Sequence, residues 1–179
     1  LRRELMKQCC AQYPADIKTN FRAICQELYL KKEREYHLIA IDIFMKEVKS
    51  NYLVDDIYII ENMIISNSWW DSVDVVAKYL VGGYLVQFPE KKLSLIERFS
   101  NSDNRWLIRT AIIFQLSYKE KTNFEILISE CEKHKHSNEF FIQKAIGWAL
   151  RDYSRFNPSG VTAYVNSTNL KPLSSREAL

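Results

Sequence analysis

The stretch SNSWWDSVDVV (66–76) places two tryptophans beside two aspartates, and such residues could do chemistry. On a helix over 70–83, Trp70, Asp74 and Lys78 follow one another at i, i+4 and i+8 and share one side. An indole face suits sugars, bases or cations, and a nearby carboxylate suits a developing positive charge. The apolar core stripe of this helix consists of Val73, Val76, Ala77 and Leu80.

The two neighbouring residues, Trp69 and Asp71, have simpler explanations. Trp69 falls closer to the core side of the expected helix, so we expect a structural role. Asp71 belongs to the first turn, where the helix dipole favours a carboxylate. Asp74 comes a turn later, beside Trp70, and the dipole does not explain it.

Basic residues occupy one side of two further expected helices. Over 103–117, Arg105 and Arg109 are one turn apart and flank an apolar face; taken alone, they could be solvated or paired with acids. Over 138–154, basic residues and a tryptophan lie opposite the apolar side. These residues are Lys144, Trp148, Arg151 and, just beyond the helix, Arg155. The alternative for Trp148 is packing beneath a neighbouring loop.

These side chains would form one site if their helices were the inner helices of successive repeats. The concave surface would then carry Trp70, Asp74, Arg109, Trp148 and Arg151. Arginines suit phosphates because their planar guanidinium donates bidentate, charge-assisted hydrogen bonds.

A degenerate repeat supports this arrangement. The segments REYHLIAI (34–41), RWLIRTAI (105–112) and EFFIQKAI (139–146) each combine a charged start, an aromatic and a final Ala-Ile. Their spacing gives roughly 35 residues per unit, the length of a helical hairpin in a HEAT or armadillo solenoid. We therefore predict an all-α solenoid of HEAT-like repeats with a concave basic surface; a non-repetitive helical bundle is the alternative.

Helical periodicity and turn residues give the expected elements. Turns are expected at Pro14, Gly82–Gly83, Pro89, 100–103 and Asn157–Pro158, the last as a helix N-cap followed by proline. The expected helices span 17–31, 34–49, 53–65, 70–83, 90–98, 103–117, 122–133, 138–154 and 158–166.

Composition excludes several classes of protein. Only four glycines and four prolines among 179 residues argue against sandwiches and doubly wound sheets. A net charge of +3 permits a nucleic-acid partner without requiring one. The four cysteines and three histidines lack the spacing of zinc ligands, and we expect no metal, no cofactor and a reducing compartment. We expect no membrane span.

Nearly the whole chain resembles the AlkD-type DNA alkylation repair glycosylases, which are built from HEAT-like repeats. The resemblance rests on YPADIKTNFRAICQEL (13–28), REYHLIAIDI (34–43), SWWDSVD (68–74), NRWLIRTAIIFQLSYKEKT (104–122) and the segment from FFIQKAIGWALRDY to the end (140–179). Its most specific motifs are WWDxVD and KAIGWALRxY. The resemblance implies one domain over 1–179, preceded in the family by a helical segment, with a site-lining aromatic, that this chain lacks.

The resemblance also implies an activity and the residues that carry it. The family's active-site tryptophans, aspartate and arginine match Trp70, Trp148, Asp74 and Arg109. The implied activity is hydrolysis of the N-glycosidic bond of cationic N3- and N7-alkylated purines in duplex DNA, as in base excision repair, without base flipping. DNA-backbone contacts would come from Arg109 and from the further basic residues Lys144, Arg151, Arg155, Lys78 and Arg105. We expect a monomer in the bacterial cytoplasm, associated with the nucleoid.

A second hypothesis is a non-catalytic helical-repeat module that binds DNA or a protein. The basic stripe fits such a module, but Asp74 would then be unfavourable near phosphates.

Overall fold

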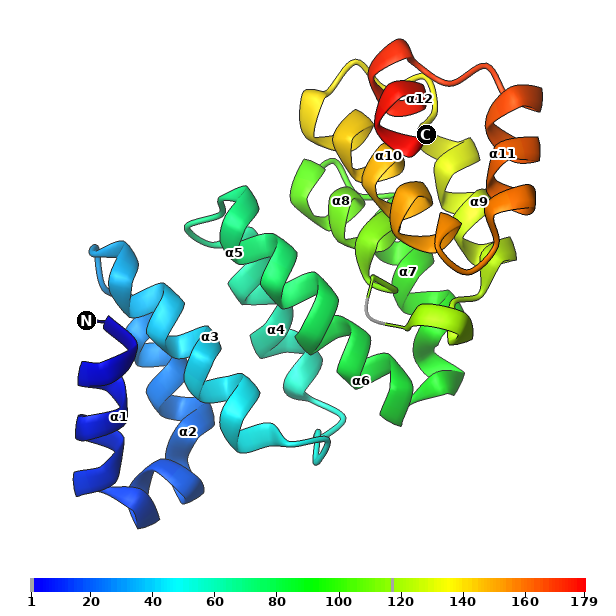
Figure 1. Ribbon diagram of the computed structural model, residues 1–179. Helices are drawn as coiled ribbons and strands as arrows, with labels where there is room; N and C mark the ends of the chain where they lie inside the picture. The colour runs from blue at the N-terminus through cyan, green and yellow to red at the C-terminus, as the bar shows by residue number, and fades with distance from the viewer. Residues whose placement is uncertain (1, 117) are drawn as a thin grey trace. The chain divides into compact units, whose positions relative to one another are not determined.

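The computed structural model describes residues 2–116 and 118–179, and these residues form helices and connecting turns without any β-strand (Figure 1). This confirms the predicted all-α fold. The chain divides into two compact units, Leu1–Val76 and Ala77–Leu179, each with its own core. The expectation of a single domain over 1–179 stays a prediction. None of the helices that the described residues form is both long and apolar enough to cross a membrane.

The described residues of the first unit, 2–76, form five α-helices. Its core lies where α2 and α3 pack side by side, and α1 and α5 also contact α3 (Figure 1). Phe21 and Phe44 meet there edge to face, with ring centroids 5.3 Å apart. The helices of this unit are α1 (Arg2–Gln12), α2 (Pro14–Tyr29), α3 (Arg34–Val48), α4 (Asp56–Ile65) and α5 (Trp70–Val75).

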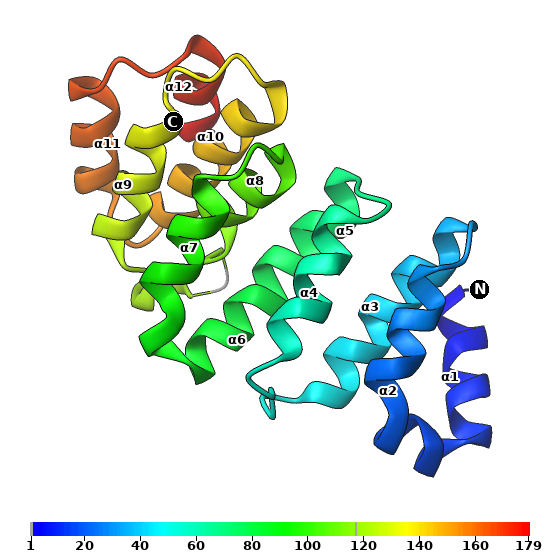
Figure 2. The ribbon, with the colours of Figure 1, turned by 180° about the vertical axis from the view of Figure 1, so that it is seen from behind.

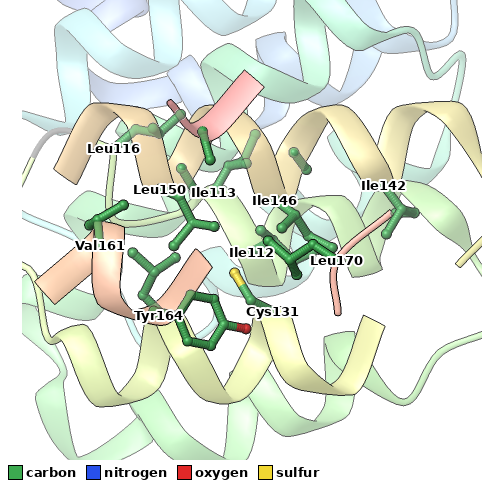
Figure 3. Close-up of a cluster of buried hydrophobic side chains, with 14 of the residues drawn as sticks. Ile112, Ile113, Leu116, Cys131, Ile142, Ile146, Leu150, Val161, Tyr164 and Leu170 are labelled. Atoms are coloured by element: carbon green, nitrogen blue, oxygen red, sulfur yellow. The ribbon is translucent and has the colours of Figure 1, made fainter. Parts of the chain in front are cut away.

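The second unit is organised around the helix α10 (Phe140–Ser154), which packs against α8, α9, α11 and α12 (Figure 2). The core in Figure 3 includes Ile112 of α8, Cys131 of α9, Ile146 of α10 and Tyr164 of α11. The remaining helices are α6 (Gly82–Gln87), α7 (Lys92–Ser100), α8 (Arg105–Ile113), α9 (Phe124–His134), α11 (Pro158–Ser167) and α12 (Pro172–Ala178). Val76–Val81 is a π-helix, and Pro89–Lys91 and Lys119–Lys121 are 3₁₀ turns.

Contacts at a constant sequence separation reveal the repeat. Within each unit, hydrogen bonds join side chains to groups 34 positions further along the chain, which is the repeat length expected from the sequence. These pairs are Arg22–Asp56 and Tyr29–Met63 in the first unit, and Ser100–His134 and Arg105–Glu139 in the second. A repeat protein gives this pattern because each hairpin packs its equivalent positions against the next hairpin.

The region after Val75 differs from the prediction of one helix over 70–83. A π-helix follows α5, and Gly82–Gly83 begin α6 instead of forming a turn. Gly82 is required by packing, because an added Cβ would lie 2.8 Å from the carbonyl oxygen of Phe114. The hydroxyl of Tyr118 donates to the Gly82 carbonyl at 2.7 Å. The 100° step of an α-helix does not hold in the π-helix, so the expected alignment of Lys78 with Trp70 was built on the wrong period.

Two other boundaries test the turn residues. The Asn157 side chain accepts a hydrogen bond from the Gly160 amide at 3.0 Å, and Pro158 is the first helical residue, which confirms the predicted N-cap. Pro14 likewise opens α2. Helices α1, α6 and α12 were not predicted, and α8 ends at Ile113, short of the predicted 103–117. The last residue of that predicted helix, 117, lies outside the described residues.

Candidate nucleic-acid interface and active-site residues

The segment WWD (69–71) of the first unit is fixed by side-chain hydrogen bonds of the residues on both sides of it. Asn67 adopts a left-handed backbone with φ of 51° and donates from its side chain to the Tyr29 carbonyl at 3.1 Å. The hydroxyl of Ser68 donates to the Ile64 carbonyl at 2.6 Å, and that of Ser72 to the Trp69 carbonyl at 3.0 Å. The start of α5 is therefore anchored at the residues that precede Trp70.

Trp70 and Asp74 differ sharply in exposure although they share one side of α5. Trp70 is 47% exposed, whereas Asp74 is 9% exposed. Residues 70–75 are regular α-helix, so the i, i+4 spacing places Trp70 and Asp74 on one side of it, as predicted. An accessible indole beside a shielded carboxylate is the arrangement that a cationic or sugar-like group would meet.

The neighbouring residues were predicted with mixed success. Asp71 does lie in the first turn of α5, and its carboxylate also pairs with the guanidinium of Arg34. The expectation that Trp69 lies on the core side is wrong, because this residue is 47% exposed. Trp69 is the N-cap residue with an extended backbone (φ −148°, ψ 154°), so its direction does not follow the helical period.

The arginines of α8 lie in different environments. Arg109 is only 4% exposed and donates from Nη1 to the carbonyl of Phe141 at 2.6 Å, which ties α8 to the start of α10. Arg105 is exposed, pairs with Glu139 at 3.4 Å and lies over the ring of Trp106. The suggestion that the two form a solvated pair therefore fails for Arg109, and the suggestion of an ion pair holds for Arg105.

The predicted polar side of α10 is present in the second unit. Trp148 is partly buried and packs against the hydrophobic core of this unit. Lys144 and Arg151 flank it along the helix, and both form ion pairs with Glu177 of α12, at 2.9 and 3.1 Å. Arg155 follows α10 as its exposed C-cap residue. Sequence reasoning missed Glu177, which no local pattern links to α10.

Two other features belong to the second unit. Lys78 is a half-buried residue of the π-helix, and its Nζ is 5.0 Å from the ring centroid of Tyr79. A hollow of about 410 Å³ is lined by residues of α7 and α9, and none of the predicted site residues lines it. Across residues 2–116 and 118–179, no group of three or more histidines, cysteines or acids is placed as metal ligands would be.

Comparison with known proteins gives consistent matches. A family model described as DNA alkylation repair enzyme matches residues 1–179. A predicted DNA alkylation repair enzyme from Enterococcus faecalis is 32% identical, with a TM-score of 0.88 over 99% of this chain and 82% of that one. No curated protein matches the chain significantly.

Two structures from Streptococcus mutans show the fold at lower identity. The protein smu.31 is 17% identical with a TM-score of 0.72, over 98% of this chain and 90% of that one. AlkD2 is 16% identical with a TM-score of 0.72, over 99% of this chain and 88% of that one.

Proposed function

Since the chain belongs to the family of DNA alkylation repair enzymes, we propose that it is a DNA glycosylase acting on cationic N3- and N7-alkylated purines in duplex DNA. The observation that carries the proposal is the i, i+4 placement of Trp70 and Asp74 on α5, which puts an accessible indole and a shielded carboxylate on one side of the helix. All four residues that match the family's active site are present: Trp70, Asp74, Arg109 and Trp148.

Departure of the alkylated base needs little acid catalysis. Alkylation at N3 or N7 gives the purine a formal positive charge, so the base leaves as a neutral molecule with the electrons of the C1′–N9 bond. The deoxyribose then has oxocarbenium character, as in glycoside hydrolysis. Water adds to C1′ and releases one proton to solvent, which leaves an abasic site and the free base.

Asp74 is proposed to stabilise the positive charge on the sugar and to orient the water. A preorganised group of this kind contributes about 3–4 kcal/mol to lowering the barrier. Trp70 and Trp148 are proposed to contact the sugar, each worth about 0.5–2 kcal/mol by cation–π attraction. Uncharged lesions would be poor substrates, because their bases need a proton before they can leave. The lesion would stay in or near the duplex, since the sugar is contacted instead of a flipped base.

Arg109 is proposed to bind a phosphate near the lesion, with Lys78, Arg105, Lys144, Arg151 and Arg155 as candidates for further backbone contacts. Because Arg109 is buried and bonded to the Phe141 carbonyl, we expect its replacement to lower stability as well as activity. Activity measurements on Arg109 variants therefore need a matched measurement of folding.

The decisive test compares the parent protein with Asp74→Asn. Release of 7-methylguanine and 3-methyladenine from methylated duplex DNA should fall about 100- to 1,000-fold, since 3–4 kcal/mol of charge stabilisation is lost. Binding to the same DNA should persist. Asp71→Asn is the matched control, because it removes an aspartate of the same helix that pairs with Arg34 and is partly exposed; its base release should change only a few-fold.

The same experiment separates the second hypothesis. A parent protein that is folded, binds DNA and releases neither base would contradict the glycosylase and leave a binding module. In that case Asp74→Asn should bind DNA as well as the parent or better, because a negative charge near phosphates is removed.

A further inference from the structure

The C-terminal helix α12 is seated closely on α10. Gly147 makes the approach possible, because a Cβ at this position would lie 2.4 Å from the Glu177 Cβ and 2.8 Å from the Ser174 carbonyl oxygen. The hydroxyl of Ser174 donates to the Gln143 carbonyl at 3.0 Å. Ser174 and Ala178 are buried at this contact, with exposures of 0% and 1%. The backbone that carries Glu177 is thus held in place without help from its own carboxylate.

The Glu177 carboxylate bridges the two cations that flank Trp148. Its Oε1 lies 2.9 Å from Lys144 Nζ, and its Oε2 lies 3.1 Å from Arg151 Nη1. Hydrogen bonds from these two side chains, that of Lys144 first, lower the pKa of Glu177 below its ordinary value. The carboxylate therefore stays charged at neutral pH and cancels one of the two positive charges on this side of α10.

The two ion pairs of Glu177 are exposed enough for another anion to replace its carboxylate. The Lys144 and Arg151 side chains keep 37% and 50% of their surface accessible. Exposed ion pairs of this kind contribute only about 0–1 kcal/mol to stability, and Gly147 and Ser174 already fix α12. A phosphate oxygen is the same kind of acceptor as a carboxylate oxygen, so a DNA backbone can take the place of Glu177 on either cation at small cost.

We propose that Glu177 is a positioning and specificity residue for DNA binding. It holds Lys144 and Arg151 on either side of Trp148 and competes with phosphates for them, which weakens binding to undamaged duplex. This inference rests on the proposed function only in that α10 faces DNA, and it makes no use of base release.

The expected change in DNA affinity and in its salt dependence follows from counterion release. Each phosphate that a protein neutralises adds about −0.9 to the slope of log affinity against log salt concentration. Freeing one positive charge should therefore make the slope steeper by up to about one. At 0.1 M salt, affinity for undamaged duplex should rise about three- to tenfold, since a slope of −0.9 over one decade below 1 M gives nearly tenfold.

The experiment measures fluorescence anisotropy of a labelled, undamaged duplex between 50 and 300 mM salt, for the parent and Glu177→Gln. Glu132→Gln is the matched control. Glu132 pairs with Lys135 at 2.6 Å, and its pKa is also lowered by that lysine, but it belongs to α9. Tighter binding and a steeper slope for Glu177→Gln alone are expected. Equal changes in both variants, or weaker binding by Glu177→Gln, would overturn the proposal.

Two further variants keep the result interpretable if α12 loosens. In a Lys144→Gln/Arg151→Gln background, adding Glu177→Gln should no longer raise affinity, because its two partners are gone. A persistent gain there would also overturn the proposal. Glu177→Asp keeps the charge and should behave like the parent in salt slope. Undamaged duplex is the probe throughout, so the result stands whether or not the protein releases alkylated bases.

Discussion

The ion pair between Arg22 and Asp56 should be the most sensitive polar contact of the first unit. The guanidinium donates two hydrogen bonds to the carboxylate, from Nε to Oδ1 at 2.5 Å and from Nη2 to Oδ2 at 2.7 Å. Asp56 is 2% exposed and also accepts from the Leu53 amide at 2.9 Å. Arg22 lies 4.4 Å from the Phe21 ring centroid. The pair connects α2 to α4, one repeat further along the chain.

Replacing Arg22 by methionine keeps the apolar stem and removes the donors. Breaking a buried ion pair from one side costs about 3–5 kcal/mol, because a charge stays buried without its partner. The lower end applies here, since the Leu53 amide still donates to Asp56 and the Arg22 side chain is 27% exposed, which lets water approach. Loss of the cation–π contact adds about 0.5–1 kcal/mol. We expect a total loss of about 3–4 kcal/mol.

The assay is urea unfolding combined with amide hydrogen exchange. Exchange read in peptides from Leu1–Val76 assigns the loss to this unit, because a chain with two compact units need not unfold in one step. Arg3→Met is the control. Arg3 is 74% exposed, and Arg2 still pairs with Asp42 when Arg3 is gone, so the expected loss is below about 1 kcal/mol.

A double variant completes the test. Arg22→Met/Asp56→Asn should be more stable than Arg22→Met alone, because the buried charge leaves with its partner. If Arg22→Met loses no more free energy of unfolding than Arg3→Met, the reasoning is refuted, and Asp56 must be stabilised by other groups.

Two further predictions concern the second unit. Gly147→Ala gains about 1 kcal/mol of helix preference, but its Cβ would lie 2.4 Å from the Glu177 Cβ and 2.8 Å from the Ser174 carbonyl oxygen, so an overpacking cost of about 1–3 kcal/mol prevails. Hydrogen exchange in 172–179 should become faster and Tm should fall. A raised Tm would contradict the tight approach of α12 to α10. Burial lowers the pKa of His134, whose Nε2 lies 2.8 Å from Ser100 Oγ. Its folded pKa lies below the unfolded value of 6.5, so its stabilisation is present above pH 6.5 and is lost as pH falls through the folded pKa. Urea unfolding at pH 7.5 and 5.0 should show a larger loss for the parent than for His134→Gln, and equal losses would count against this account.

Local signals predicted the parts of the fold that depend on a few neighbouring residues. The N-cap at Asn157 and the i, i+4 pair of Trp70 and Asp74 are of this kind. The repeat length could also be predicted, because equivalent helices keep similar buried faces. Trp69 could not, since its direction is set by an extended cap that the helical period does not describe.

The features that could not be predicted depend on contacts between residues far apart in the sequence. The glycine pair at 82–83 looks like a turn in sequence, yet it begins α6, and position 82 needs a glycine because a Cβ there would lie 2.8 Å from the Phe114 carbonyl oxygen. The burial of Arg109 depends on the carbonyl of Phe141, 32 residues away, and the partner of Lys144 comes from a seven-residue helix too short for a periodic signal. No window of sequence contains both members of such pairs.

The cysteines bear on how the protein itself meets alkylating agents. Three of the four, Cys10, Cys25 and Cys131, are buried, and burial raises the pKa of all three thiols, that of Cys25 to about 12. The thiolate is the form that attacks electrophiles, so these three thiols are both shielded and chemically quiet. Cys9 alone among the described cysteines is exposed, near the start of the chain in α1. Alkylating agents that damage the DNA of a cell would therefore modify little of this protein's core.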